Sequence, residues 1–242
     1  MDFYKSMLSR KKQGQKQFTV LVDPDKLSSD QVKTLAQIGQ QSGIDWFFVG
    51  GSLLTHNSLD QCIKIIKDHS DIPVILFPGN TLQMSTKADA ILFLSLISGR
   101  NAEMLIGRHV ISAPYLKLSN LEVISTGYML IESGKPTTVS YMSNSVPIPA
   151  DKDDIAACTA MAGEMLGMKL IFMDAGSGAN TPVSESMITT VSKSIDIPLV
   201  IGGGINTTEK AVAAFNSGAD MVVMGNAIEK DMTLVPRVIE AI

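Results

Sequence analysis

Short apolar stretches alternate with amphipathic segments along most of the chain. The apolar stretches lie within residues 18–22, 43–52, 71–80, 90–94, 121–131, 167–178, 199–201 and 221–224. Most of the segments between them carry apolar residues at helical spacing, which predicts helices with one buried face. Strands that are apolar on both faces and alternate with helices indicate a parallel sheet covered on both sides. The pattern therefore predicts an α/β fold.

Two parts of the chain repeat the same order of elements. Residues 43–80 and 167–206 each contain an apolar strand, a helical segment, the tripeptide Asp-Ile-Pro and a second strand. Proline presets φ and is tolerated at the start of a strand, where no ladder donor is needed. A (β/α)8 barrel typically has about 250 residues, and this chain has 242. We therefore predict a single (β/α)8 TIM barrel domain over residues 1–242.

The third strand–helix unit is too short for the regular pattern. Only residues 78–90 separate Phe77 from Ile91, and a full helix with two loops needs more chain than that. The third helix is therefore predicted to be missing or reduced, which leaves a gap in the helical shell.

Three further segments have their own expected structures. Residues 3–12 are predicted to form a leading helix, and a helix from about residue 102 to 112 should follow the fourth strand. Residues 133–149 are rich in turn formers and β residues, so we expect a hairpin-like excursion or a mobile loop there.

The last two strands each end in residues suited to holding a phosphate. The seventh strand stops at Gly202, Gly203 and Gly204, where the missing Cβ lets backbone N–H groups approach an anion. The eighth stops at Gly225 and Asn226, before a helix whose N-terminus favours negative charge. A tight strand-to-helix turn is the alternative interpretation of each cluster, but their occurrence at successive strand ends favours the phosphate.

Polar side chains at other strand ends are candidates for chemistry. Asp23 and Ser52 follow adjacent strands, so a carboxylate and a hydroxyl could hold a hard cation that takes its remaining ligands from a diphosphate. Capping of the following turn by Asp23 explains its position equally well. Asp174 ends an apolar strand one strand away from the glycine cluster. It is the best candidate base, with a turn cap as the alternative.

Composition argues against several other classes of protein. The net charge is −4, so the basic excess of a nucleic-acid-binding protein is missing and no such partner is expected. The two cysteines and three histidines lack the spacing of zinc ligands or of a disulfide framework. No apolar run reaches the roughly 18 residues of a membrane span, and the N-terminus lacks the apolar core of a signal peptide. We expect a cytoplasmic protein with at most peripheral membrane contact.

Seven motifs together resemble the geranylgeranylglyceryl phosphate synthase family, including its bacterial heptaprenylglyceryl phosphate synthase-like relatives. They are, in chain order, LVDPDK, FFVGGS, ILFPGN, PYLKLSNLEVISTGYMLIE, FMDAGSGA, VIGGGI and VMGNAI. The resemblance covers nearly the whole chain and implies a modified barrel without its third helix. It also implies Mg²⁺-dependent transfer of a polyprenyl group, expected to be geranylgeranyl, from its diphosphate to the 3-hydroxyl of sn-glycerol 1-phosphate. Phospholipid biosynthesis and a homo-oligomer, either a dimer or a hexamer, are implied as well.

The same resemblance assigns roles residue by residue. Asp23 and Ser52 match the magnesium positions, and Tyr128 matches the tyrosine after the fifth-strand Thr-Gly, expected to be catalytic together with Asp174. The glycerol phosphate site is matched by Phe172, Met173, Asp174, Ala175, Gly176, Ser177, Gly178, Gly203, Gly204, Gly225 and Asn226. Many members have Tyr-Leu-Glu at residues 172–174, so this chain lacks a hydroxyl and has a shorter carboxylate there. We expect Asp174 to accept the proton of the glycerol hydroxyl as diphosphate leaves.

Three alternatives stay open on the sequence alone. The donor could be longer, such as heptaprenyl diphosphate, because the sequence does not indicate which side chain closes the apolar groove expected near Met84, Leu94 and Leu96. A phosphosugar isomerase could use a similar phosphate-binding barrel, and a non-catalytic phosphate-binding barrel is the third alternative.

Overall fold

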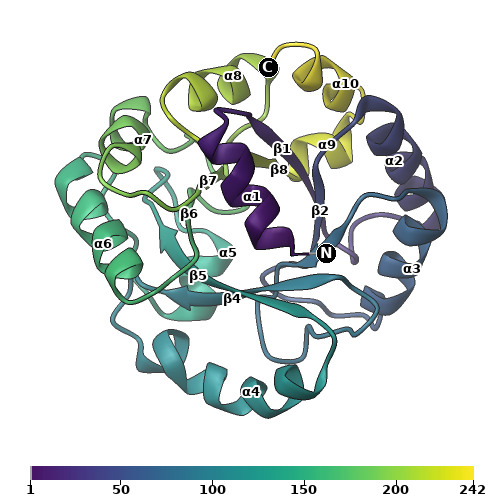
Figure 1. Cartoon of the computed structure of the whole chain (residues 1–242), viewed down its shortest axis with the longest axis horizontal. Helices are drawn as coiled ribbons and strands as arrows, with labels where there is room; N and C mark the ends of the chain where they lie inside the picture. Colours follow the sequence, from purple (N-terminus) through teal and green to yellow (C-terminus); the bar gives the residue numbers. More distant parts are fainter. Residues whose placement is uncertain (1) are drawn as a thin grey trace.

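The computed structural model describes residues 2–242, in which parallel strands close into a barrel (Figure 1). Each strand pairs with the next in chain order, and the last pairs with the first. The strands are β1 (Gln17–Val22), β2 (Trp46–Val49), β3 (Val74–Leu76), β4 (Ala90–Leu96), β5 (Glu122–Leu130), β6 (Leu170–Asp174), β7 (Leu199–Gly202) and β8 (Met221–Met224). The predicted (β/α)8 fold class is therefore confirmed.

An outer ring of helices covers the barrel (Figure 1). It contains α2 (Ser29–Ser42), α3 (Leu59–His69), α4 (Arg108–Leu118), α6 (Asp153–Met165), α7 (Glu185–Ser192), α8 (Thr208–Asn216) and α10 (Leu234–Ile239), while the short α9 (Asn226–Lys230) lies inside the ring (Figure 1). Local sequence sets many of the ends. Ser28 and Gln31 form a capping box at the start of α2, and Gly43 ends that helix in the left-handed conformation at φ 78°.

The helix of the third unit is missing, as the short connection predicted. In the element order of residues 2–242, β4 follows β3 directly with no helix between them. Residues 77–89 cross this gap in the ring as turns, bends and irregular chain. The shell is therefore open between α3 and α4, next to β3 and β4.

Side chains alternate between the barrel interior and the layer beneath the helices, because successive residues of a strand point to opposite faces. Phe48 and Phe172 belong to the interior cluster, whereas Phe47 and Met173 pack in the outer cluster under the helices. All four are essentially inaccessible to solvent. This alternation decides which residues at a strand end can face the barrel axis.

Helix α1 (Phe3–Lys12) lies across one opening of the barrel (Figure 1). The backbone N–H groups of Phe3 and Tyr4 donate to the Glu122 carboxylate at 2.6 and 2.9 Å. The Phe3 ring meets Trp46 edge to face with 6.1 Å between ring centroids. Both partners are the first residues of their strands, so the predicted leading helix covers the N-terminal opening. Ligands must then approach from the C-terminal ends of the strands.

Two predicted segments differ from the structure. Residues 133–149 were expected as a hairpin or mobile loop, but they contain α5 (Thr138–Ser143), whose first turn has a Thr137–Ser140 capping box. That expectation is wrong because the cap outweighs the β propensity of the flanking residues. The helix expected at residues 102–112 begins as a π-helical segment, η1 (Glu103–Gly107), and continues as α4 to Leu118. It accommodates Pro114 and extends further because Leu116 buries its last turn.

None of the helices formed by residues 2–242 combines the length and the apolar character that a membrane crossing requires.

Candidate active site

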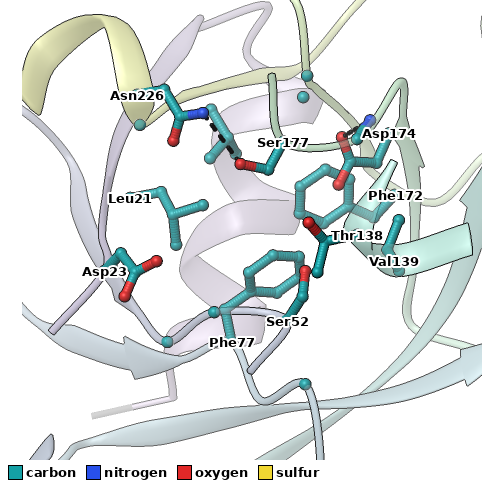
Figure 2. Close-up of a pocket in the computed structure, with 18 of the residues that line it drawn as sticks. Leu21, Asp23, Ser52, Phe77, Thr138, Val139, Phe172, Asp174, Ser177 and Asn226 are labelled. Atoms are coloured by element: carbon teal, nitrogen blue, oxygen red, sulfur yellow. Dashed lines mark hydrogen bonds between the residues drawn. The ribbon is translucent and has the colours of Figure 1, made fainter. Parts of the chain in front are cut away.

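A cavity of about 990 Å³ opens at the C-terminal ends of the strands, where barrel enzymes place their active sites. Figure 2 shows side chains from several strand ends turned toward this space. The predicted site residues that line it are Asp23, Ser52, Tyr128, Phe172, Asp174, Gly176, Ser177, Gly178, Gly203, Gly204, Gly225 and Asn226. Met173 and Ala175 are fully buried and belong to the outer cluster instead. Met173 points to the outer face of β6, and Ala175, directly after the strand, packs in the same outer layer, so neither side chain lines the cavity.

The seventh strand end needs its glycines. Gly203 and Gly204 have φ of 78° and 70°, in the left-handed region that favours glycine. A Cβ on Gly203 would collide with Oδ1 of Asp174 and the backbone nitrogen of Gly176, and one on Gly204 would collide with the backbone of Pro182. The ends of β6 and β7 therefore approach each other more closely than side chains would allow. Such backbone-walled concavities suit anions.

Asn226 links three segments around the same space. Its Nδ2 donates to Oγ of Ser177 at 2.9 Å, and its Oδ1 accepts from Nζ of Lys26 at 3.0 Å (Figure 2 shows the first bond). Asn226 is the first residue of α9, next to Gly225 at the end of β8. The predicted phosphate residues of β6, β7 and β8 thus surround one part of the cavity.

Asp174 and Tyr128 form a buried pair. The Tyr128 hydroxyl donates to Oδ2 of Asp174 at 2.6 Å, while the Gly176 N–H donates to Oδ1 at 2.7 Å. Burial raises the pKa of Asp174, and these two hydrogen bonds oppose the rise. Burial, followed by the nearby Asp174 charge, raises the pKa of Tyr128 well above its ordinary value. One carboxylate oxygen thus caps the turn, as one interpretation predicted, and the other is held by a tyrosine beside the cavity.

An aromatic wall lies next to this pair. Phe172 stacks on Phe77 with 5.1 Å between centroids and meets Tyr128 edge to face at 5.6 Å. Phe172 is 1% exposed, so its ring fills space in the barrel interior. A hydrogen bond to a ligand at this position must come from another residue, since phenylalanine has no hydroxyl. Sequence reasoning did not select Phe77, although it ends the third apolar run.

Asp23 lies at the end of β1, beside the end of β2. Its Oδ1 accepts from the Asp25 N–H at 3.1 Å, and its Oδ2 lies 3.2 Å from Nζ of Lys26. Figure 2 shows Asp23 and Ser52 bordering the same cavity. Within residues 2–242, no group of three or more His, Cys, Asp and Glu side chains could hold a metal ion. The oxygen donors of Asp23 and Ser52 suit a hard cation such as Mg²⁺, provided that a ligand completes its coordination.

The cavity continues into the gap left by the missing helix. Met84, Leu94 and Leu96, where the groove was expected, all line it. Further apolar lining comes from Ile91, Phe93, Met104 and Leu116. The space therefore has a polar end at the strand tips and an apolar extension toward the open side of the shell.

Four residues near the strand ends also line the cavity and were not predicted as site residues. Thr138 and Val139 of α5 face the cavity (Figure 2), because the residues expected to form a hairpin fold over the end of β6. Leu21 and Lys26 line it as well. Lys26 is the last residue of the Asp-Pro-Asp-Lys sequence that begins with Asp23. Its place in that motif was the sequence feature that could have identified it as a site residue. No local signal pointed to Thr138 beyond the capping pattern around it.

Comparison with known proteins gives a consistent set of matches. Residues 10–242 match the PcrB family. A geranylgeranylglyceryl phosphate synthase of Chitinophaga pinensis is 55% identical over 239 residues, which cover 99% of this chain and 95% of the relative. A protein of the same name from Flavobacterium johnsoniae is 47% identical over 94% of each chain. The crystal structure of (S)-3-O-geranylgeranylglyceryl phosphate synthase from Thermoplasma acidophilum, in complex with substrate sn-glycerol-1-phosphate, has a TM-score of 0.94 and 33% identity. It covers 100% of this chain and 98% of that one.

Proposed function

This chain belongs to the PcrB family, and on that premise we propose that it is a prenyltransferase acting on sn-glycerol 1-phosphate. It joins a polyprenyl group, from a polyprenyl diphosphate, to the 3-hydroxyl of the glycerol and releases diphosphate. The names of the similar proteins favour geranylgeranyl diphosphate as the donor and a place in lipid biosynthesis. They also favour this reaction over a phosphosugar isomerase.

The observation that carries the proposal is the shape and chemistry of the one cavity described above. Its polar end combines glycine-rich strand ends for a phosphate with the Tyr128–Asp174 pair for proton transfer. Its apolar extension, past Met84 and Leu96, fits a hydrocarbon chain. A phosphosugar or a free phosphate has no hydrocarbon chain that could fill that extension.

In the proposed reaction, the bond between the allylic carbon and the diphosphate oxygen breaks, and its electron pair leaves with diphosphate. The 3-hydroxyl oxygen of glycerol bonds to that carbon, and its proton passes to Oδ2 of Asp174. Tyr128 keeps this oxygen oriented at 2.6 Å. Burial raises the pKa of Asp174 and so makes the carboxylate a better base than an exposed one.

The phosphate of the acceptor is proposed to lie against Gly203, Gly204, Gly225 and Asn226. Gly176, Ser177 and Gly178 close the same region from the end of β6. The aromatic wall of Phe77 and Phe172 excludes water from the reacting atoms. Since Phe172 provides no hydroxyl, the glycerol hydroxyls must be bound by neighbouring groups, among which Thr138 borders the cavity.

Magnesium dependence is a further part of the proposal. Asp23 and Ser52 would hold the ion, because they are oxygen donors at adjacent strand ends of the cavity. When bound, Mg²⁺ would neutralise charge on the leaving diphosphate.

We also propose that the protein forms a homo-oligomer. Exposed large apolar side chains gather along η1 and α4, on the outer side of the barrel. They are Ile106, Val110, Ile111, Tyr115 and Leu118, each at least 60% exposed. A continuous apolar face of this kind is typical of a surface between subunits.

The proposed function is tested with radiolabelled sn-glycerol 1-phosphate and prenyl diphosphates of graded length, from farnesyl to heptaprenyl. Lipid-soluble product should form in the presence of Mg²⁺, and its rate should be highest with one donor length. Failure to form product with any donor would refute the prenyltransferase. A maximum at heptaprenyl diphosphate would support the longer-donor alternative.

A further inference from the structure

Lys26 connects the proposed phosphate end of the cavity with its carboxylates. Its Nζ donates to Oδ1 of Asn226 at 3.0 Å and lies 3.2 Å from Oδ2 of Asp23. A second carboxylate, Oε2 of Glu229, lies 3.7 Å from the same nitrogen. Asp23 directly follows β1, whereas Asn226 and Glu229 belong to α9, and Lys26 and Asn226 are 200 positions apart in the chain. Lys26 therefore sits at the junction of the first and last units of the barrel.

The ammonium group of Lys26 makes one hydrogen bond and two ion-pair contacts. Its Nζ donates to Oδ1 of Asn226, and the carboxylates of Asp23 and Glu229 lie 3.2 and 3.7 Å away, so the contact to Glu229 is the longest of the three. The side chain remains 43% exposed, whereas those of Asp23 and Glu229 are 15% and 11% exposed. Lys26 also lines the cavity. A phosphate in the cavity can therefore approach the ammonium group at the expense of the long contact to Glu229.

The contact with Asn226 determines which way its amide points. Because Lys26 donates to Oδ1, Nδ2 is turned toward Ser177 and the cavity. One N–H of Nδ2 binds Ser177, and the other is available to an anion. Without Lys26, the amide oxygen of Asn226 loses the donor that keeps Nδ2 directed toward Ser177.

The charges around Lys26 also favour a role in binding the phosphate. Asp23 and Glu229 put two negative charges beside the space proposed for a phosphate, and Lys26 is the cation within ion-pair distance of both. A phosphate next to two unbalanced carboxylates would be repelled. Lys26 thus reduces the repulsion between these two carboxylates and the phosphate, and its ammonium group can also donate a hydrogen bond to the phosphate.

We propose that Lys26 binds the phosphate of the acceptor and positions Asn226 for the same phosphate, an inference that rests on the proposed function. In this proposal Lys26 contributes to binding of the acceptor, whereas Asp23 contributes to binding of Mg²⁺. A lysine that only pairs with Asp23 to stabilise the turn after β1 would have no effect on the affinity for the acceptor.

The test is calorimetric titration with sn-glycerol 1-phosphate in magnesium-free buffer containing a chelator, so that neither prenyl transfer nor a metal enters the measurement. Lys26→Met should weaken binding at least about tenfold, as expected for the loss of a charged hydrogen bond. Lys26→Arg keeps the charge and should restore binding to within about threefold of wild type. Lys33→Met removes an exposed lysine of α2 that does not line the cavity, and it should leave the affinity unchanged.

Equal affinities of wild type and Lys26→Met would overturn the inference and leave the proposed function standing. A wild-type protein that does not bind sn-glycerol 1-phosphate would overturn both. If Lys26→Met does not fold, Lys26→Gln replaces it in the titration, because it removes the charge and keeps a polar side chain at this half-exposed position. Binding should again weaken at least about tenfold, and an unchanged affinity would overturn the inference.

Discussion

The hydroxyl of Tyr128 donates to Oδ2 of Asp174 at 2.6 Å, although the two residues are 46 positions apart. Strands β5 and β6 are adjacent, with Tyr128 level with Phe172 and Leu130 level with Asp174. Tyr128 therefore reaches one inward-facing position along the neighbouring strand to meet the carboxylate. This diagonal contact is possible because alternate residues of both strands point into the barrel. It makes the protonation of Asp174 depend on Tyr128.

Asp174→Asn should lower kcat at least about a hundredfold, because the amide keeps the shape of the carboxylate but cannot accept the proton. The affinity for sn-glycerol 1-phosphate should change little. Burial raises the pKa of Asp174, so the charged form costs the folded state free energy at pH values above the ordinary carboxyl pKa. The variant should therefore be at least as stable as wild type at pH 7 to 8. Steady-state kinetics will measure the change in kcat, and thermal denaturation will measure the change in stability.

Asp174→Glu serves as the companion variant and should remain active. Near-normal turnover of Asp174→Asn together with a lower melting temperature would instead assign Asp174 to capping the turn through Gly176.

Tyr128→Phe should move the acidic limb of the kcat/KM profile to higher pH. The hydrogen bond from Tyr128 lowers the pKa of Asp174, so its removal leaves the effect of burial less opposed and raises that pKa. A hydrogen bond to a charged group contributes about 1.5 to 3 kcal/mol, which corresponds to a shift of about one to two pH units. Tyr115→Phe, at an exposed tyrosine of α4, is the matched control. A profile that stays in place would mean that the pair is not coupled in the active enzyme.

Asp23→Asn should lower the Mg²⁺-dependent kcat at least about a hundredfold. The affinity for sn-glycerol 1-phosphate should stay within about threefold of that of the wild type. The amide oxygen can still accept from the Asp25 N–H, so the turn after β1 is preserved. Asp23→Ala should lose turnover in the same way. A chelator should likewise stop wild-type turnover, and added Mg²⁺ should restore it. Equal loss of turnover and acceptor binding would assign Asp23 to folding or capping.

Met84→Trp should shorten the donor that the enzyme accepts. Met84 lines the apolar extension of the cavity in the segment without a helix, and a larger side chain fills space meant for hydrocarbon. We expect kcat/KM for geranylgeranyl diphosphate to fall at least about tenfold, with a smaller change for farnesyl diphosphate. Competition between the two donors in one reaction measures the ratio directly. An equal loss for both would remove Met84 from the prenyl path.

Light scattering should give wild-type protein a mass of at least twice the 25.9 kDa of one chain. Val110→Asp and Ile111→Asp should lower the mass, because each places a charge in the exposed apolar face of α4. Lys33→Asp on α2 should not. A wild-type monomer would contradict the proposal of a homo-oligomer, and unchanged mass in both α4 variants would move the interface to another surface.

Local patterns were sufficient for most of the fold. The alternation of apolar strands and helices predicted the barrel, and the short segment between Phe77 and Ile91 predicted the missing helix. Polar and glycine residues at the strand ends, such as Asp23 and Gly203, were expected around a single opening. These predictions succeed because parallel strands in a barrel bring all their C-terminal ends to one face. A residue's position at the end of a strand is therefore enough to predict that it lies at this opening.

Other features depend on contacts that no local pattern contains. The capping box at Thr137 was present in the sequence, but only the folded chain places α5 over the end of β6. Met173 was grouped with its neighbours by motif, whereas the pleat of β6 turns it away from the cavity.

The sequence by itself determined which residues stand at the strand ends, and hence the barrel and the composition of the site. Tertiary structure alone decided how those residues are paired. Tyr128 with Asp174, and Lys26 with Asn226, are separated by 46 and 200 positions. Their contacts arise from strand register and from closure of the last unit against the first, and both are properties of the complete barrel rather than of any segment within it.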